Sequence, residues 1–159
     1  MNANSSLSFF ISIQNQTLNV CDSRAHKTVA SFPISTSKFG EGQIEGSNCT
    51  PLGKFSIAAK IGDNAPRGEV FKGRVSVGNF HTQPECFDNS QDLILTRILW
   101  LQGEEPDNQN TYARYIYIHG TNQEHLLGTK ASYGCIRVAE DDLLYLYDIA
   151  QIGTMVVIR

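Results

Sequence analysis

Hydrophobic and polar residues alternate along most of the chain, which is the pattern of half-buried β-strands. The first three strands form a meander whose first turn lies at Asn15 and Gln16. The expected strands cover residues 7–14, 17–21, 28–34, 55–60, 75–77, 93–101, 114–118 and 154–158. The segments between them are rich in Gly, Ser, Thr and Pro, so we expect long ordered loops, above all over residues 35–53.

One segment, residues 139–151, has apolar residues at helical spacing instead. Three acidic residues in its first turn complement the helix dipole, and Gly153 is a typical C-terminal stop. The acidic residues are Glu140, Asp141 and Asp142, and the apolar ones are Leu143, Leu144, Leu146, Tyr147 and Ala150. The chain is therefore expected to be strand and loop with a single helix near its C-terminus.

Length and composition indicate one domain over residues 1–159, with residues 1–6 as a flexible N-terminus. The net charge of −3 and the scattered basic residues argue against nucleic acid as a partner. No apolar run reaches the roughly 18 residues that a membrane-spanning helix needs. Membrane segments are therefore not expected.

The N-terminus lacks the charged and apolar regions of an export signal, so the sequence predicts a cytoplasmic protein. If the chain is a mature domain with an added initiator Met, the periplasm is the alternative. The four cysteines are spaced 28, 37 and 49 residues apart without a Cys-x-x-Cys pair, so we expect free thiols, no metal and no cofactor.

The strongest candidate for chemistry is Cys135, sixteen residues after His119 at a strand end. A nearby imidazole and backbone amides can lower a thiol pKa from about 8.5, which yields a nucleophilic thiolate. Gly134 allows a sharp turn, and the amides around it are candidate oxyanion donors. The alternative from these residues alone is that Cys135 is a small buried residue beside a turn.

The two motifs that contain His119 and Cys135 resemble those of a known family. Residues 116–121 (IYIHGT) and 132–137 (SYGCIR) resemble the signature of the YkuD-type L,D-transpeptidase catalytic domain. Residues 33–36, 46–55 and 95–101 match further segments of that family, so the resemblance spans residues 7–159. It implies a mostly β fold, a curved β-sheet sandwich with one main helix packed against it. Many members have His where this chain has Tyr133.

The resemblance also implies a cysteine acyl-transfer mechanism on peptidoglycan stem peptides or muropeptides. In it, Cys135 attacks the stem, His119 moves the proton, and the amides of Tyr133, Gly134 and Cys135 hold the oxyanion. Ser132, Gly120 and Thr121 are expected to position this machinery. Carbapenem-type β-lactams are expected to acylate the thiol. The chain looks like a short cytoplasmic member, which favours an L,D-carboxypeptidase that removes the terminal D-Ala during wall recycling.

Two other functions remain open at this stage. One is an L,D-transpeptidase that forms 3,3 cross-links, and the other is a non-catalytic domain that binds wall fragments. Two arginines are candidate substrate ligands: Arg137 binds a substrate carboxylate or forms a structural ion pair, and Arg97 lines the site or finds a partner elsewhere. The ring of Tyr133 is a candidate wall of the substrate groove.

Overall fold

The computed structural model describes residues 6–159. The expected flexible segment 1–6 lies outside this range except for Ser6, whose carbonyl accepts hydrogen bonds from Ser23. The strands are β1 (Leu7–Ser12), β2 (Thr17–Asp22), β3 (Lys27–Ser35), β4 (Gly53–Ile61), β5 (Glu69–Lys72), β6 (Val75–Asn79), β7 (Ile94–Gly103), β8 (Tyr117–Gly120), β9 (Ile136–Val138) and β10 (Met155–Ile158). The helices are α1 (Glu140–Ile149) and the short 3-10 helices η1 (Pro84–Cys86) and η2 (Glu124–Leu126).

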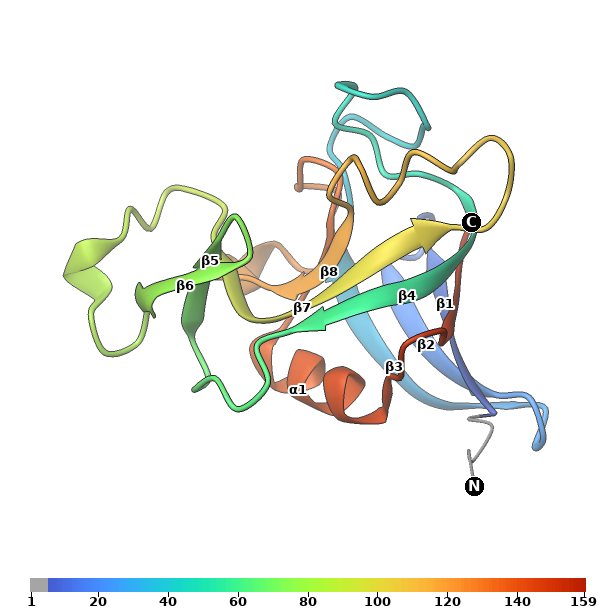
Figure 1. Ribbon diagram of the computed structural model, residues 1–159, viewed down its shortest axis with the longest axis horizontal. Helices are drawn as coiled ribbons and strands as arrows, with labels where there is room; N and C mark the ends of the chain where they lie inside the picture. Colours follow the sequence, from blue (N-terminus) through green and yellow to red (C-terminus); the bar gives the residue numbers. More distant parts are fainter. Residues whose placement is uncertain (1–5) are drawn as a thin grey trace.

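The strands form one curved sheet that closes on itself. Its order is β4-β10-β1-β2-β3-β9-β8-β7-β5-β6, and β4 also pairs with β7. Because β4 bonds to both β10 and β7, eight strands make a closed ring, and the β5–β6 hairpin extends from the β7 edge (Figure 1). Most neighbours are antiparallel, whereas β1–β10 and β8–β9 are parallel.

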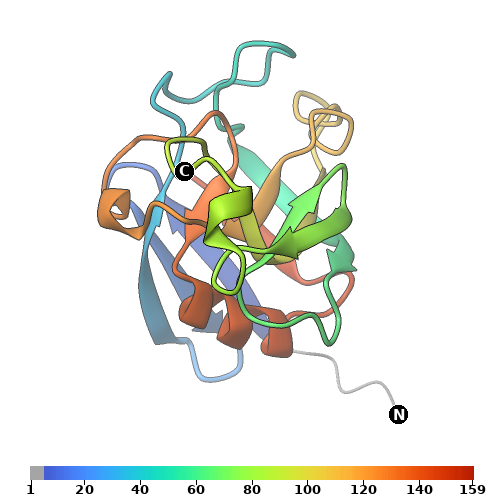
Figure 2. The same ribbon diagram turned by 90° about the vertical axis from the view of Figure 1, so that its left-hand side faces the viewer.

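The hydrophobic core lies inside this ring and continues into α1. Alternate strand residues such as Phe9, Ile11 and Phe55 are fully buried, as the period of two requires. Leu143 and Leu146 join the same cluster, and α1 packs against β7 and β8. Figures 1 and 2 show α1 at one end of the molecule and long loops at the other. The structure thus confirms the mostly β fold with one helix near the C-terminus.

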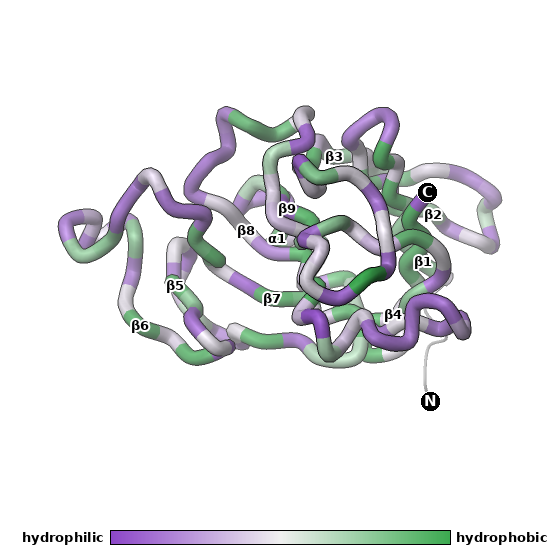
Figure 3. Tube along the Cα trace, turned by 90° about the horizontal axis from the view of Figure 1, so that it is seen from above, coloured by the Kyte–Doolittle hydropathy of each residue, from purple (hydrophilic) through white to green (hydrophobic). Residues whose placement is uncertain are grey.

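The loop end is polar, whereas the strands beneath it are hydrophobic. Figure 3 looks down on this end and shows largely hydrophilic loops around green stretches in the strands. Residues 35–53 run there as the expected ordered loop, held by the bridges Ser37–Ser132 and Glu41–Thr50. This loop therefore lies beside the segment that carries Cys135.

The expected strand over residues 114–118 is wrong in its first half. The chain turns through residues 108–115, with Tyr115 at φ 57°, and β8 begins only at Tyr117. The aromatic alternation there arises from packing around Trp100, whose ring stacks on Tyr112 at 3.9 Å. His119 consequently lies inside β8, one residue before its end.

Two short strands, β5 and β9, have no counterpart among the expected elements. They contain four and three residues, too few for an alternation to emerge. The helix is also shorter than expected, because Ala150 already has extended geometry (φ −74°, ψ 141°) and caps it. Gly153, at φ 90°, serves the turn toward β10 instead of the helix end. Within residues 6–159, no helix is long and apolar enough to cross a membrane.

Candidate active site

The two candidate catalytic residues lie at two adjacent parallel strands: His119 is in β8, and Cys135 directly precedes β9. β8 and β9 pair with His119 opposite Arg137, so continuing the register places Cys135 beside Tyr117. Accordingly, the Tyr117 N–H donates to Cys135 Sγ at 3.4 Å. Since side chains alternate, His119, Cys135 and Arg137 emerge on the same face of the two strands. His119 lies directly opposite Arg137 across a strand gap of about 5 Å, whereas Cys135 lies diagonally across it, two residues before Arg137.

The imidazole of His119 is held in one tautomer. It is buried, and its Nδ1 lies 2.7 Å from the carbonyl oxygen of Gly120. A carbonyl only accepts hydrogen bonds, so Nδ1 carries the proton and Nε2 keeps a lone pair. Burial lowers the pKa of His119 below its usual range. The resting imidazole is therefore neutral and suited to act as a base. The partner that the motif left open is the Gly120 carbonyl.

The thiol of Cys135 is neutral at rest. Burial raises its pKa to about 12, against a smaller opposing effect of the Tyr117 N–H. The thiol donates to the carbonyl oxygen of Tyr115 at 3.4 Å. Desolvation thus outweighs the nearby donor and positive charges that could lower this pKa. Nucleophilic attack from this state requires transfer of the thiol proton to a base.

The turn before Cys135 is fastened by Ser132. The Ser132 hydroxyl donates to the Cys135 carbonyl at 2.7 Å and accepts the Gly134 N–H at 3.2 Å. Thr50 Oγ1 donates to the Gly134 carbonyl at 3.0 Å. Gly134 has φ +125°, a conformation that other residues rarely adopt. Ser132 therefore has the contacts of a positioning residue, and the Gly134 amide, an expected oxyanion donor, is already engaged.

Gly120 and Thr121 shape the other side of the pair. A Cβ on Gly120 would lie 2.6 Å from the Leu95 carbonyl oxygen, so β7 and β8 approach this closely only because residue 120 is glycine. Thr121 is buried, and its hydroxyl accepts the N–H of Gln123 at 3.0 Å. This turn orients the Gln123 side chain so that its Oε1 accepts a hydrogen bond from Arg137.

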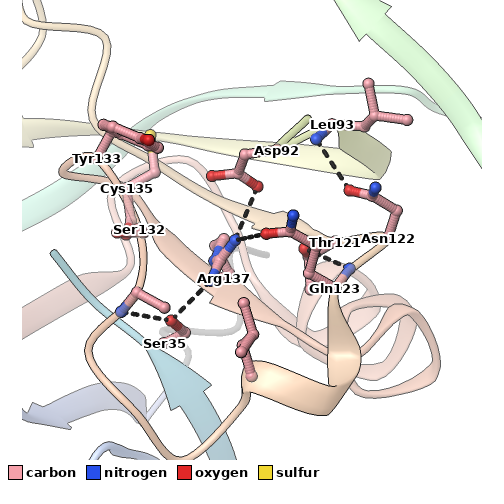
Figure 4. A network of polar contacts seen from close by, with 12 residues as sticks. Ser35, Asp92, Leu93, Thr121, Asn122, Gln123, Ser132, Tyr133, Cys135 and Arg137 are labelled. Carbon is pink, nitrogen blue, oxygen red and sulfur yellow. Dashed lines mark hydrogen bonds and ion pairs between the residues drawn. The ribbon is translucent and has the colours of Figure 1, made fainter. Parts of the chain in front are cut away.

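The guanidinium of Arg137 is fully buried beside the pair. It forms an ion pair with Asp92 at 3.0 Å and donates to Gln123 Oε1 at 2.7 Å and to Ser35 Oγ at 3.0 Å (Figure 4). Arg137 was expected either to bind a substrate carboxylate or to form a structural ion pair, and these contacts are those of the structural ion pair. Asp92, Gln123 and Ser35 lie outside the motifs, and a lone acid before a buried strand does not single out Asp92 in the sequence.

Arg97 does not join this group. Its guanidinium donates to the carbonyl oxygens of Ala65 and Thr96 and lies 5.4 Å from the ring centroid of Tyr147 in α1. Tyr147 belongs to α1, and Thr96 bonds Glu140, the first residue of that helix. The structure therefore places Arg97 with the helix, where its charge has protein partners.

Tyr133 stands between two hollows at the site. The first, of about 490 Å³, is lined by Ser90, Gln91, Asp92, Gln123, Ala131 and Tyr133. The second, of about 250 Å³, is lined in part by Glu45, Asn48, Arg114, Tyr115 and Tyr133. Tyr133 is 56% exposed, and Lys38 lies over its ring at 4.4 Å and donates to its hydroxyl. A substrate has room on either side of this ring.

Two further features concern metal ligands and the state of the cysteines. Within residues 6–159, no three His, Cys, Asp or Glu side chains are grouped so that they could hold a metal ion. All four cysteines are free thiols. The chemistry available at the loop end is that of a thiol, a neutral imidazole and a buried ion pair.

Comparisons with known proteins identify relatives of this chain. The putative L,D-transpeptidase YqjB of Bacillus subtilis is 35% identical over 107 residues, which cover 67% of this chain and 58% of that protein. An L,D-transpeptidase from Xylanimonas cellulosilytica matches in structure over 100% of this chain and 63% of its own, with a TM-score of 0.62 and 17% identity. L,D-transpeptidase 3 from Mycobacterium tuberculosis, in complex with a faropenem-derived adduct, matches over 97% and 60%, with a TM-score of 0.60 and 15% identity.

The chain therefore spans less than two thirds of the length of each of these relatives. The structural matches are too distant in sequence to show more than the shared fold. The family model described as YkuD, the L,D-transpeptidase catalytic domain, matches residues 8–158. With nearly the whole sequence matched, the chain belongs to the YkuD family of L,D-transpeptidase catalytic domains.

Proposed function

We propose that this chain is a cysteine-dependent L,D-carboxypeptidase that removes the terminal D-Ala from peptidoglycan tetrapeptide stems through an acyl-enzyme. The observation that carries the proposal is that His119 on β8 and Cys135, which directly precedes the parallel neighbour β9, emerge on the same face, with the imidazole fixed as a base by Gly120. Membership of the family supports a peptidoglycan peptide as substrate. The adduct in the mycobacterial relative supports acylation of such a site by β-lactams.

In the proposed reaction, the Cys135 proton passes to His119 Nε2 as the sulfur attacks the carbonyl carbon of the third stem residue. The carbonyl electrons move to oxygen, which the amides of Tyr133 and Cys135 are proposed to stabilise. The C–N bond then breaks, and the imidazolium gives its proton to the departing D-Ala amine. A thioester on Cys135 remains. Water, activated by the now neutral His119, hydrolyses it and restores the thiol.

The second candidate function is L,D-transpeptidation, in which an amine of another stem replaces water. The names of the relatives favour it, since the Bacillus protein is a putative L,D-transpeptidase. Both reactions share the acyl-enzyme, and they differ only in the acceptor. Hydrolysis needs no second peptide, so we place it first.

The test is mass spectrometry of a disaccharide-tetrapeptide after incubation with the protein, with and without an acceptor tripeptide. We expect loss of one D-Ala with the wild type and at least a 1000-fold slower reaction with Cys135→Ala, because the nucleophile is absent. Cys86→Ala, which removes an exposed thiol far along the chain, is the matched control and should leave the rate unchanged. A joined product would assign transpeptidation, whereas an unchanged substrate with the wild type would contradict both reactions and favour a wall-fragment binding domain.

A further inference from the structure

A partly buried carboxylate, Asp92, lies beside the candidate catalytic pair without belonging to either motif. It precedes β7, lines the larger hollow next to Tyr133, and is 19% exposed. Its Oδ1 lies 3.0 Å from a terminal nitrogen of Arg137. Figure 4 shows its carboxylate pointing at Arg137, with Cys135 and Tyr133 on the neighbouring turn. The position of Asp92 raises the question of what a carboxylate does there.

The ion pair acts electrostatically on both catalytic groups. The charged residues that influence His119 are Asp92 and Arg137, and those that influence Cys135 are these two and Arg114. The Asp92 carboxylate favours a protonated imidazole and disfavours a thiolate, whereas Arg137 has the opposite effects. His119 is buried and Cys135 is partly buried, so these charges are only weakly screened.

The proton transfer in the proposed reaction separates charge at this place. When the Cys135 S–H bond breaks and the His119 Nε2–H bond forms, a positive imidazolium appears beside a negative sulfur, and then beside an oxyanion. A buried cation without a compensating charge is costly. Asp92 supplies a negative charge near the imidazolium. Its ion pair also neutralises the buried Arg137 guanidinium, whose positive charge would otherwise repel the imidazolium.

We propose that Asp92 is a positioning residue for this reaction: through its ion pair it holds the Arg137 guanidinium at the β8–β9 step and compensates the positive charge that forms on His119. Gln123 and Ser35 hold the same guanidinium with neutral groups, so they fix its position without neutralising its charge. The carboxylate is the part of the network that a neutral side chain of the same shape cannot replace. This inference rests on the proposed acyl transfer by Cys135 and His119.

The discriminating variant is Asp92→Asn, which keeps the shape and removes the charge. The first measurement is an NMR titration of the His119 imidazole, assigned with His119→Gln. Without the carboxylate, the remaining positive charge of Arg137 should lower the His119 pKa further, so the imidazole stays neutral at the pH at which the wild-type ring is half protonated. A merely structural role predicts the opposite sign, because loosening would let water in and raise this pKa toward its ordinary value.

The second measurement is the rate at which a carbapenem acylates Cys135, followed by intact-protein mass. We expect acylation to slow about tenfold or more in Asp92→Asn and to recover substantially in Asp92→Glu, which restores the charge. Asp88→Asn is the matched control, since Asp88 lies in the same segment and its carboxylate accepts from the N–H and hydroxyl of Ser90. An Asp92→Asn protein with an unchanged or raised His119 pKa, or one that is acylated as fast as Asp88→Asn, would overturn the inference. The NMR titration needs no substrate, so a failure of the proposed function alone leaves its result intact.

Discussion

At the scale of single residues, the unexpected feature is that Cys135 and His119 rest as neutral partners. Burial raises the pKa of Cys135 to about 12 and lowers that of His119. The two shifts have the same cause, because desolvation disfavours the charged form of each group. A neutral pair does not lose a proton to solvent between turnovers, and the thiol becomes nucleophilic only when substrate lets the proton move to the imidazole.

This resting state predicts the pH dependence of thiol alkylation. The rate of Cys135 with iodoacetamide should rise about tenfold per pH unit from pH 7 to 10, because the thiolate fraction grows throughout that range below a pKa of about 12. Peptide-level mass spectrometry separates Cys135 from the exposed Cys86, which serves as the internal reference. A rate for Cys135 that is already constant between pH 6 and 8 would show a preformed thiolate–imidazolium pair and contradict the neutral state.

The sequence singled out part of the candidate site, and what it missed has a physical cause. Motif spacing pointed to Cys135 and His119 because both lie on a short stretch of backbone with specific turn chemistry. Asp92 approaches Arg137 from the loop before β7, across 45 positions of sequence, and such an approach leaves no local pattern. The resting protonation states also escaped prediction, since they depend on burial by the surrounding loops.

At the scale of elements, the first residue of α1 ties the helix to β7 and to the loop after β6. Glu140 is buried; its carboxylate accepts from Thr96 Oγ1 at 2.6 Å and lies 2.7 Å from His81 Nε2. Thr96 has φ 78°, a strained conformation for a β-branched residue, at the register shift between β7 and β8. The same residue therefore stabilises the helix start, the β7 irregularity and the loop after β6.

Replacing this carboxylate should destabilise the protein measurably. We expect Glu140→Ala to lower the free energy of unfolding by about 1–3 kcal/mol, because the Thr96 hydroxyl is left buried without its acceptor. Urea denaturation measures the change. Asp141→Ala is the matched control: its carboxylate binds Arg67 at 2.8 Å but is 79% exposed, so its loss should cost no more than about 1 kcal/mol. Equal midpoints for the two variants would show that the Glu140 contacts contribute nothing.

The elements themselves show where pattern reading succeeds. The long strands β4 and β7 were predicted close to their observed bounds, because buried residues recur along each, and in β7 on both faces. Residues 114–116 were misread as strand, because the aromatic side chains there pack around Trp100 while the backbone bends at Tyr115. An alternating pattern of apolar and polar residues shows which side chains are buried. At that turn the side chains are packed although the backbone is not extended.

At the scale of the whole molecule, the closed ring and the β5–β6 hairpin differ in how they are held. Every strand of the ring pairs on both sides, and β10 joins β1 to β4. Among residues 6–159, the hairpin pairs with β7 through two residue pairs, Val70–Leu95 and Phe71–Ile94, and β6 pairs with no strand other than β5. Val75 and Val77 of β6 are also largely exposed.

This difference predicts two levels of opening in native-state hydrogen exchange. Amides of residues 69–79 should exchange about tenfold faster or more than those of β1 and β10, because the hairpin can detach while the ring stays closed. Phe71→Ala should speed exchange in the hairpin alone, since Phe71 is its buried anchor, whereas Val75→Ala on the exposed edge is the matched control. Exchange at one common rate, with the same denaturant dependence in hairpin and ring, would contradict separate opening.

The hairpin also connects to the site, which gives its opening a functional consequence. Arg74, at the β5–β6 turn, lies 5.0 Å from the ring centroids of Trp100 and Tyr115, and the Tyr115 carbonyl accepts the Cys135 thiol. Detaching the hairpin removes Arg74 from these rings and loosens the segment that holds the thiol. We therefore expect Phe71→Ala to raise the alkylation rate of Cys135 at pH 8 in proportion to the faster exchange of the hairpin, with Val75→Ala unchanged. An increase in hairpin exchange without any change at Cys135 would show that the site is held by the closed ring alone.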